Sequence, residues 1–399
     1  MKVEQDTPVS RPLVAQAKRR EAPRASADWT GSPAARAALD LLNNGAPRLV
    51  ARAPCRLDVI GGLSDYAGAS VLFTPLEGHD CVAVQLRNDG QLSIVSSERD
   101  SKTPTIIALS DLGEGGHPIS AERAGDLLSG DQDRTVRCVV GVVVEMLRAG
   151  MMPDLGDGLS IAVAASPDSG PTTREQDASV AAATLVSTAA ALDISLDPLA
   201  SAGVCQTVQN QWLDSPVGIS EALCALLGEP GTLSNMRCAP LSQTDSLHLP
   251  DSTALIAMDC GVIHPDAAQK YKLVRTAAFM GRSLIDRIVR HDQLKEVAWK
   301  GHLSDVTIDD YVGKFRDRIP TKMKGGEFLK RFGDTDDALT RIDPNVLYKI
   351  RSRTEHHIYE HWRAQQFFEF LRRAVHDGDD GALTEAGELM YASHWSYGQ

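Results

Sequence analysis

Residues 53–68 hold two side chains whose types and spacing suit ligand chemistry. Arg56 opens a short β-branched run, and Asp65 follows the glycine pair Gly61-Gly62. Glycine pairs mark tight turns, so we expect the guanidinium and the carboxylate to lie near one concave bend. A tight hairpin that carries two ordinary charged residues is the other interpretation of this segment.

A second pattern with chemical meaning is the run from His357 through Glu360 to His361. This H-x-x-E-H spacing places two imidazoles and a carboxylate on one helix face, as in zinc hydrolases. Such a site also needs a third protein ligand well downstream, and few acids follow before Gln399. We therefore expect a polar helix face beside a domain junction and no metal site. The apolar residues expected to face the core are Ile350, Ile358, Trp362 and Phe368.

Composition excludes several classes of protein. The chain has 399 residues, 43% of them apolar and 24% charged, which is enough for two or more packed domains. Lys and Arg total 41 against 53 Asp and Glu, and a net charge of −12 disfavours a nucleic-acid partner. The seven cysteines form no CxxC pair, which is typical of reduced core residues in a cytoplasmic protein. No run reaches the roughly 18 to 20 apolar residues of a membrane span, so no membrane is expected.

Apolar periodicity and turn residues predict an α+β chain in which strands precede helices. We expect a flexible tail over residues 1–32, a first domain over 33–245 and a second over 246–399. The change from the first domain to the second is expected in a stretch rich in Ser, Thr, Asp and Pro, 241–252. The expected strands are 48–53, 56–60, 70–74, 81–86, 92–96, 105–109, 159–165 and 254–260. The expected helices are 34–42, 135–147, 178–192, 197–213, a long one near 345–375, and a last one to the terminus.

The sequence of residues 53–68, APCRLDVIGGLSDYAG, resembles the first signature of the GHMP small-molecule kinases. More narrowly, it is similar to the galactokinase and plant-type arabinokinase branch, where APGR-L-D-V-x-G-G-x-x-D-Y-x-G is typical. Residues 208–210 and 216–221 resemble the family's V-E-N and P-x-G-V-M-D-Q segments. Residues 259–264, with Tyr271 and Arg275 after them, resemble D-S-G-x-x-H followed by Y-x-x-x-R.

The resemblance implies a two-domain GHMP kinase fold, with an amino-terminal domain like ribosomal protein S5 domain 2 and a ferredoxin-like carboxy-terminal domain. It also implies a cleft that binds a sugar and ATP with Mg²⁺, and transfer of phosphate to a sugar hydroxyl, usually the anomeric one. Carried over by position, Arg56 and Glu221 are expected to act in catalysis. The residues expected to bind the sugar are Asp58, Asp65, Tyr66 and Tyr271.

The phosphate loop departs from the family's pattern, P-x-G-x-G-x-S-S-S-A-A. Over residues 166–179 the chain reads SPDSGPTTREQDAS, with little of the glycine and serine left. Pro171 supplies no amide, Thr172 and Glu175 stand at capping-box spacing, and the surrounding acids repel a triphosphate. A well-capped helix start without a ligand is favoured over a nucleotide site. The candidate nucleotide contacts are Gly170, Thr172, Thr173 and Ser179.

Two further departures bear on activity. Glu221 stands where the family has its catalytic aspartate, and its extra methylene moves the carboxylate by about 1 Å, which lowers activity. Because Ala222 replaces the expected glutamine, a surface helix acid is the alternative. The family's glycine-rich carboxy-terminal motif has no counterpart before Gln399, so we expect an incomplete second domain whose open edge invites a homo- or hetero-oligomeric partner. Two functions stay open: an ATP-dependent sugar kinase, and a catalytically impaired sugar-binding or regulatory protein derived from one.

Overall fold

The computed structural model describes residues 32–42, 47–98, 103–114, 117–128, 133–152, 158–165, 173–249, 253–258 and 266–398. The expected tail therefore lies almost entirely outside the described residues. Within these ranges, no helix has both the length and the apolar character needed to cross a bilayer. Six of the seven cysteines lie in them as free thiols, five of them buried, and Cys260 lies outside.

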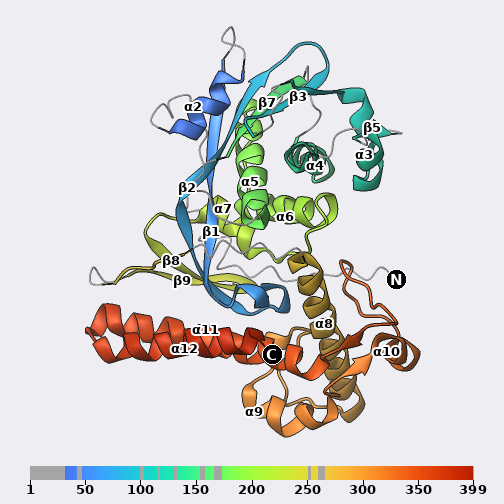
Figure 1. Cartoon of the computed structure of the whole chain (residues 1–399), viewed down its shortest axis with the longest axis vertical. Coiled ribbons are helices and arrows are strands. Elements are labelled where there is room, and N and C mark those ends of the chain that lie inside the picture. The colour runs from blue at the N-terminus through green and yellow to red at the C-terminus, as the bar shows by residue number, and fades with distance from the viewer. Residues whose placement is uncertain are drawn as a thin grey trace, which may run out of the picture.

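Among the described residues, a seven-stranded mixed sheet forms the main β layer (Figure 1). Its central strand β2 (Ser70–Leu86) pairs antiparallel with β1 (Leu49–Ile60) on one side. On the other side, β2 pairs with β7 (Gly158–Ala164) near its carboxyl end and with β8 (Thr232–Cys238) near its amino end. The remaining strands of the sheet are β3 (Gln91–Ser96), β4 (Thr105–Ala108) and β9 (Leu241–His248).

Strands β1 and β2 are longer than the sequence predicts, because two expected strands join in each. The sequence predicted two strands, 48–53 and 56–60, where the structure has the single strand β1. It predicted two more, 70–74 and 81–86, where the structure has the single strand β2. Pro54 lies in β1 where the pairing with β2 shifts its register. The backbone N–H that proline lacks therefore interrupts no regular ladder of hydrogen bonds. Pairing with a neighbour therefore carries each strand through residues that locally favour a turn.

The stretch 241–252, where the change of domain was expected, contains a strand in its first part. Strand β9 occupies 241–248 and pairs with β8 at the edge of the sheet, where polar residues can face solvent while Leu247 is buried. Residues 253–258 have no regular secondary structure, so the strand expected there is absent from the described part of 254–260. β9 crosses the expected boundary at 245, and the division into two domains stays a prediction.

Helices cover both faces of the sheet (Figure 1). α4 (Arg134–Arg148) and α5 (Thr173–Ala191) pack on one face, and α2 (Pro33–Asp40) packs on the other. Successive side chains of a strand point to opposite faces of the sheet. Val82 of β2 therefore packs on the α4 and α5 side, and its neighbour Ala83 packs on the α2 side. The other elements of this half are β5 (Gly113–Glu114), β6 (His117–Pro118), α3 (Ala121–Leu127), α6 (Pro198–Thr207) and α7 (Ser220–Leu227).

The rest of the chain is mainly helical and lies below the sheet in Figure 1. α8 (Ala267–Asp292) packs on α11 (Ile350–Asp377), and α12 (Asp380–Gly398) runs beside α11. Phe367 of α11 shares a buried cluster with Leu72 of β2, which ties this helical part to the sheet. The smaller elements are α9 (Ile308–Asp310), β10 (Met323–Lys324), α10 (Gly325–Phe332) and β11 (Leu347–Tyr348).

The mixture of one large sheet and packed helices confirms the expected α+β class. The long helix expected from about 345 begins at Ile350, because residues 347–348 pair with β10 instead. Trp362, expected in the core, is 44% exposed, whereas Ile350, Ile358 and Phe368 are buried as expected.

Candidate functional site

Arg56, Asp65 and the start of α7 meet at one point, although they come from three segments of the chain. Arg56 is on β1, and Asp65 is in the 3-10 helix η1 (Gly62–Ala67). Arg56 Nη1 donates to Ser220 Oγ at 2.7 Å, and Ser220 Oγ donates to Asp65 Oδ2 at 2.7 Å. The two residues expected near one bend are therefore joined through a single hydroxyl.

Glu221, the next residue of α7, faces the same guanidinium. Arg56 Nη2 lies 3.6 Å from Glu221 Oε1, and Glu221 Oε2 accepts a hydrogen bond from Gln209 Nε2 at 2.9 Å. Gln209 lies in a π-helical turn, η3 (Val208–Trp212), where the sequence predicted one α-helix to Leu213. Such turns are frequent at functional sites. We call the following five residues the Arg56 cluster: Arg56, Asp65, Gln209, Ser220 and Glu221.

The chain backbone encloses the Asp65 carboxylate. Asp65 Oδ1 accepts a hydrogen bond from Tyr66 N at 2.6 Å. A Cβ atom placed on Gly218 would lie 2.1 Å from Asp65 Cγ, so only glycine permits this approach. The turn before α7 therefore holds the Asp65 carboxylate beside the Ser220 hydroxyl.

Burial sets the electrostatics of the Arg56 cluster, whose five members are exposed by only 0% to 6%. Burial raises the pKa of the Asp65 carboxyl, and the nearby Glu221 charge raises it further. The Arg56 guanidinium and the hydrogen bond from Ser220 oppose this rise without cancelling it. The charge on Asp65 thus depends on its immediate neighbours, as is common at functional sites.

Tyr66 connects the Arg56 cluster to α8. Its ring meets the edge of Tyr271 with centroids 6.0 Å apart, and it stacks on Phe279 at 6.0 Å. Arg275 Cζ lies 4.7 Å from the Tyr66 ring centroid, a cation–π contact. Tyr271, one of the predicted substrate-binding residues, is therefore in contact with the residue that follows Asp65.

Helix α11 reaches the same turn through its H-x-x-E-H residues. The ring of His357 bonds Ser64 Oγ at 2.8 Å through Nδ1 and Tyr66 Oη at 3.0 Å through Nε2. His361 Nδ1 accepts from Ser70 N at 3.0 Å. Among the described residues, no group of three or more His, Cys, Asp or Glu side chains could hold a metal ion. In the structure His357 joins α11 to η1, which carries Asp65, and His361 joins α11 to β2.

Comparison with known proteins shows what this chain is related to. No protein-family model matches it. The chain is 29% identical to L-arabinokinase of Arabidopsis thaliana, over 87% of this chain and 38% of that protein. It is 26% identical to galactokinase of Canis lupus familiaris, over 63% of this chain and 60% of that protein. This chain is homologous to kinases of the galactokinase and arabinokinase branch of the GHMP family.

The fold of this GHMP kinase homologue agrees with that relationship. Galactokinase of Lactococcus lactis, solved in complex with galactose, matches it with a TM-score of 0.62 and 15% identity. The match covers 91% of this chain and 78% of that chain. At such identity the likeness concerns the fold alone, and it confirms the expected GHMP kinase fold.

Of the residues predicted to contact the nucleotide of a GHMP kinase, Ser179 has a described side chain. Gly170 and Thr172 lie outside the described residues, and Thr173 is the first residue of α5. The fully buried Ser179 hydroxyl donates to the Asp80 carboxylate and to the carbonyl of Gln176, at 3.0 Å for the latter. The bond to Asp80 joins α5 to β2, and a nucleotide contact of Ser179 stays a prediction.

Asp58, a predicted substrate-binding residue, is exposed and supports the turn beside it. Its Oδ1 accepts from Gly62 N at 3.0 Å, at the start of η1. Sequence reasoning missed two members of the Arg56 cluster, Ser220 and Gln209. Both stand inside recognised GHMP segments at positions where this chain departs from the pattern, Ser220 in place of methionine and Gln209 in place of glutamate. The departure of both residues from the GHMP pattern is the sequence signal that could have drawn attention to them.

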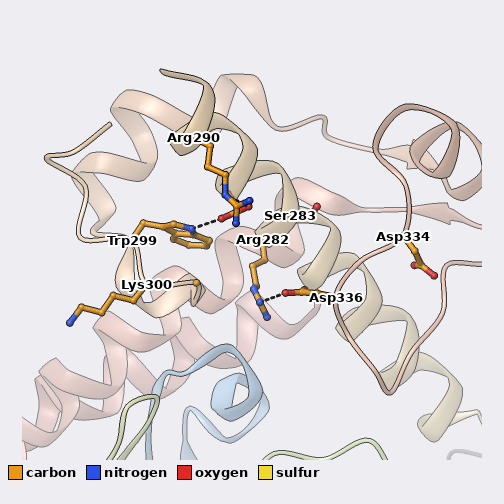
Figure 2. Close-up of a pocket in the computed structure, with 9 residues that line it drawn as sticks. Arg282, Ser283, Arg290, Trp299, Lys300, Asp334 and Asp336 are labelled. Atoms are coloured by element: carbon orange, nitrogen blue, oxygen red, sulfur yellow. Dashed lines mark hydrogen bonds and ion pairs between the residues drawn. The ribbon is translucent and has the colours of Figure 1, made fainter. Parts of the chain in front are cut away.

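A separate hollow of about 590 Å³ lies beside the second half of α8 and contains none of the predicted site residues (Figure 2). Arg282 pairs there with Asp336, and Arg290 with Asp286, whose Oδ1 also accepts from Trp299 Nε1 at 3.0 Å. Three basic and three acidic side chains line the hollow, so its charge favours neither an anionic nor a cationic ligand. Its charged lining residues are Arg282, Asp286, Arg290, Lys300, Asp334 and Asp336.

Proposed function

We propose that this chain transfers the γ-phosphoryl group of ATP to a hydroxyl of a monosaccharide of the galactose or arabinose type, with the anomeric hydroxyl as acceptor. The observation that carries the proposal is the Arg56 cluster, in which one guanidinium lies between two carboxylates. Its members come from segments that resemble GHMP motifs. L-arabinokinase and galactokinase, the relatives described above, are sugar kinases by name.

Each charged residue of the cluster has a distinct part in the proposed reaction. The sugar hydroxyl oxygen attacks the γ-phosphorus, the bond to the bridging oxygen breaks, and ADP leaves. Glu221 takes the proton of the hydroxyl, and Arg56 offsets the charge on the transferred phosphoryl group. Asp65 accepts hydrogen bonds from the sugar, whose apolar face packs beside Tyr271.

ATP and Mg²⁺ are the proposed cofactors. Mg²⁺ usually keeps several waters and binds through one or two carboxylates plus substrate phosphates. The described residues offer no group of three or more side chains that could hold a metal, which fits an ion that enters with its nucleotide.

The sequence before α5 favours a second candidate function, a sugar-binding or regulatory protein without ATP turnover. Pro171 has no amide to offer a phosphate, and Asp168, Glu175 and Asp177 surround Arg174. Helix starts bind phosphates through free amides and the helix dipole. A chain that kept Asp65 and Tyr271 but lost these amides would still bind a sugar.

Release of ADP over a panel of free sugars tests the kinase proposal. We expect release with at least one sugar of the galactose or arabinose type, and its loss in Arg56→Met assayed at a temperature at which that variant is still folded. Folded protein that releases no ADP with any sugar would overturn the proposal.

Thermal shift then separates the two functions, because a ligand that binds only the native state raises the melting temperature. A shift with MgATP supports the kinase. A shift with sugar alone, lost in Asp65→Asn and unaccompanied by any MgATP effect, supports the sugar-binding protein.

A further inference from the structure

We infer that Ser220 is a positioning residue of the candidate site, whose single hydroxyl holds the Arg56 guanidinium and the Asp65 carboxylate in a fixed relation. The inference rests on the proposed function, because it assigns those two groups to one reaction. Ser220 itself contacts neither substrate nor nucleotide in this assignment.

The donor and acceptor roles at Ser220 follow from its two partners. A guanidinium has donors only, and an ionised carboxylate has acceptors only. The hydroxyl must therefore accept from Arg56 Nη1 and give its one proton to Asp65 Oδ2, both at 2.7 Å. Ser220 is 0% exposed, so water does not compete for either bond.

The position of Ser220 in the fold makes this bridge rigid. Ser220 is the first residue of α7, and the preceding turn is held against Asp65 by the close approach of Gly218. Glu221 follows on the same helical turn and faces Arg56 Nη2 at 3.6 Å. Two consecutive side chains thus hold the two terminal nitrogens of one planar guanidinium, which fixes its plane as well as its place.

The bridge also acts on the charge of Asp65. Burial raises the pKa of this carboxyl, and the Ser220 hydrogen bond lowers it. Loss of the hydroxyl is therefore expected to move the pKa of Asp65 upward. The charged or titratable groups that face Asp65 are Arg56 and Asp58 on β1, Tyr66 in η1, Glu221 on α7 and Cys238 at the end of β8.

Ser220→Ala tests the inference against a matched control, Ser187→Ala. Ser187 is equally buried, but its hydroxyl bonds the carbonyls of Ala183 and Thr184 within α5. We expect Ser220→Ala to lower kcat by about tenfold to hundredfold, since small misplacements of catalytic groups have effects of this size. The acid limb of its kcat/KM profile should move to higher pH, while Ser187→Ala keeps the wild-type profile. Ser220→Thr, which keeps a hydroxyl, should restore the wild-type acid limb.

A measurement without catalysis separates this inference from the proposed function. Aspartate carboxyl carbons are labelled with ¹³C, Asp65 is assigned through Asp65→Asn, and its titration is followed in wild type and in both alanine variants. An upward shift of the Asp65 pKa in Ser220→Ala alone supports the bridge even if no sugar is phosphorylated. Equal Asp65 titration in Ser220→Ala and wild type overturns the inference, whatever the enzyme activity.

Discussion

Arg56 and Glu221 form one buried ion pair, with Nη2 of the first 3.6 Å from Oε1 of the second. Both side chains are 3% exposed. Buried pairs of this kind lose much of their Coulomb energy to desolvation, so they are weak evidence for stability. A guanidinium and a carboxylate held this way are preorganised for charge that develops during a reaction.

Replacement of Glu221 by glutamine should lower kcat for sugar phosphorylation by about 10² to 10⁴, because an amide cannot take the hydroxyl proton. Glu221→Asp keeps the carboxylate but withdraws it by about 1 Å, and should cost less than Glu221→Gln. Steady-state kinetics with folded protein measures both effects. Glu327→Gln, on the exposed surface of α10, is the control. Wild-type kcat in Glu221→Gln would exclude Glu221 as the base.

Asp337→Asn should destabilise the protein by about 3 to 5 kcal/mol, because it leaves the buried Arg275 guanidinium without its carboxylate. Arg275 donates to both Asp337 oxygens, at 2.8 and 2.9 Å, and the two side chains are 7% and 3% exposed. The neighbouring Asp336→Asn breaks a surface pair with Arg282 and should cost below about 1 kcal/mol. Urea unfolding measures the free energy of unfolding of both variants. Equal losses of that free energy would contradict the assignment of Asp337 to a buried ion pair and of Asp336 to a surface pair.

The stability of the protein should fall as pH drops below about 6.5, the usual pKa of histidine. Burial lowers the pKa of His356 to about 3 and of His361 to about 4 in the folded state. Below pH 6.5 the unfolded chain therefore binds more protons at these residues than the folded chain does, and proton uptake favours unfolding. The stabilising contribution is complete above pH 6.5 and is lost progressively toward pH 4.

His361→Gln isolates one of these residues, since glutamine can still accept from Ser70 N. It should make the free energy of unfolding less steep in pH between 4.5 and 6 by up to about 1.4 kcal/mol per pH unit. Chemical denaturation at several pH values measures this slope. His394→Gln, at an exposed position on α12, is the control and should change the slope less than His361→Gln does. The same slope in both variants would contradict the prediction.

Gly218→Ala should destabilise the protein by about 1 to 3 kcal/mol, because its Cβ would collide with the Asp65 carboxylate, 2.1 Å away at Cγ. Sugar affinity should fall with it, since Asp65 must move. Gly203→Ala on α6 meets no atom within 4 Å and should be neutral or stabilising. Thermal unfolding and sugar titration compare the two, and an unperturbed Gly218→Ala would show that the turn before α7 can yield.

Much of the site could be predicted from residue types in recognisable order. Arg56, Asp65 and Glu221 stood in motif positions, and the structure brings them into one cluster. The departure of Ser220 and Gln209 from the GHMP pattern marked their positions but not their roles, because the role of a hydroxyl or an amide depends on which groups lie within about 3 Å of it. The H-x-x-E-H pattern shows the same limit. It placed two histidines on one helix face, but their contacts with Ser64, Tyr66 and Ser70 decide that they join α11 to η1 and β2.

The sequence by itself determined the α+β class, most of the helices and the segments from which a site could be built. These properties are local, since apolar spacing, capping residues and turn residues act within a few positions of the chain. Only the tertiary structure decided that β1 and β2 run unbroken and that 241–248 becomes an edge strand. Strand pairing and buried charge networks depend on contacts between segments far apart in sequence, and no local pattern specifies which partner each group will meet.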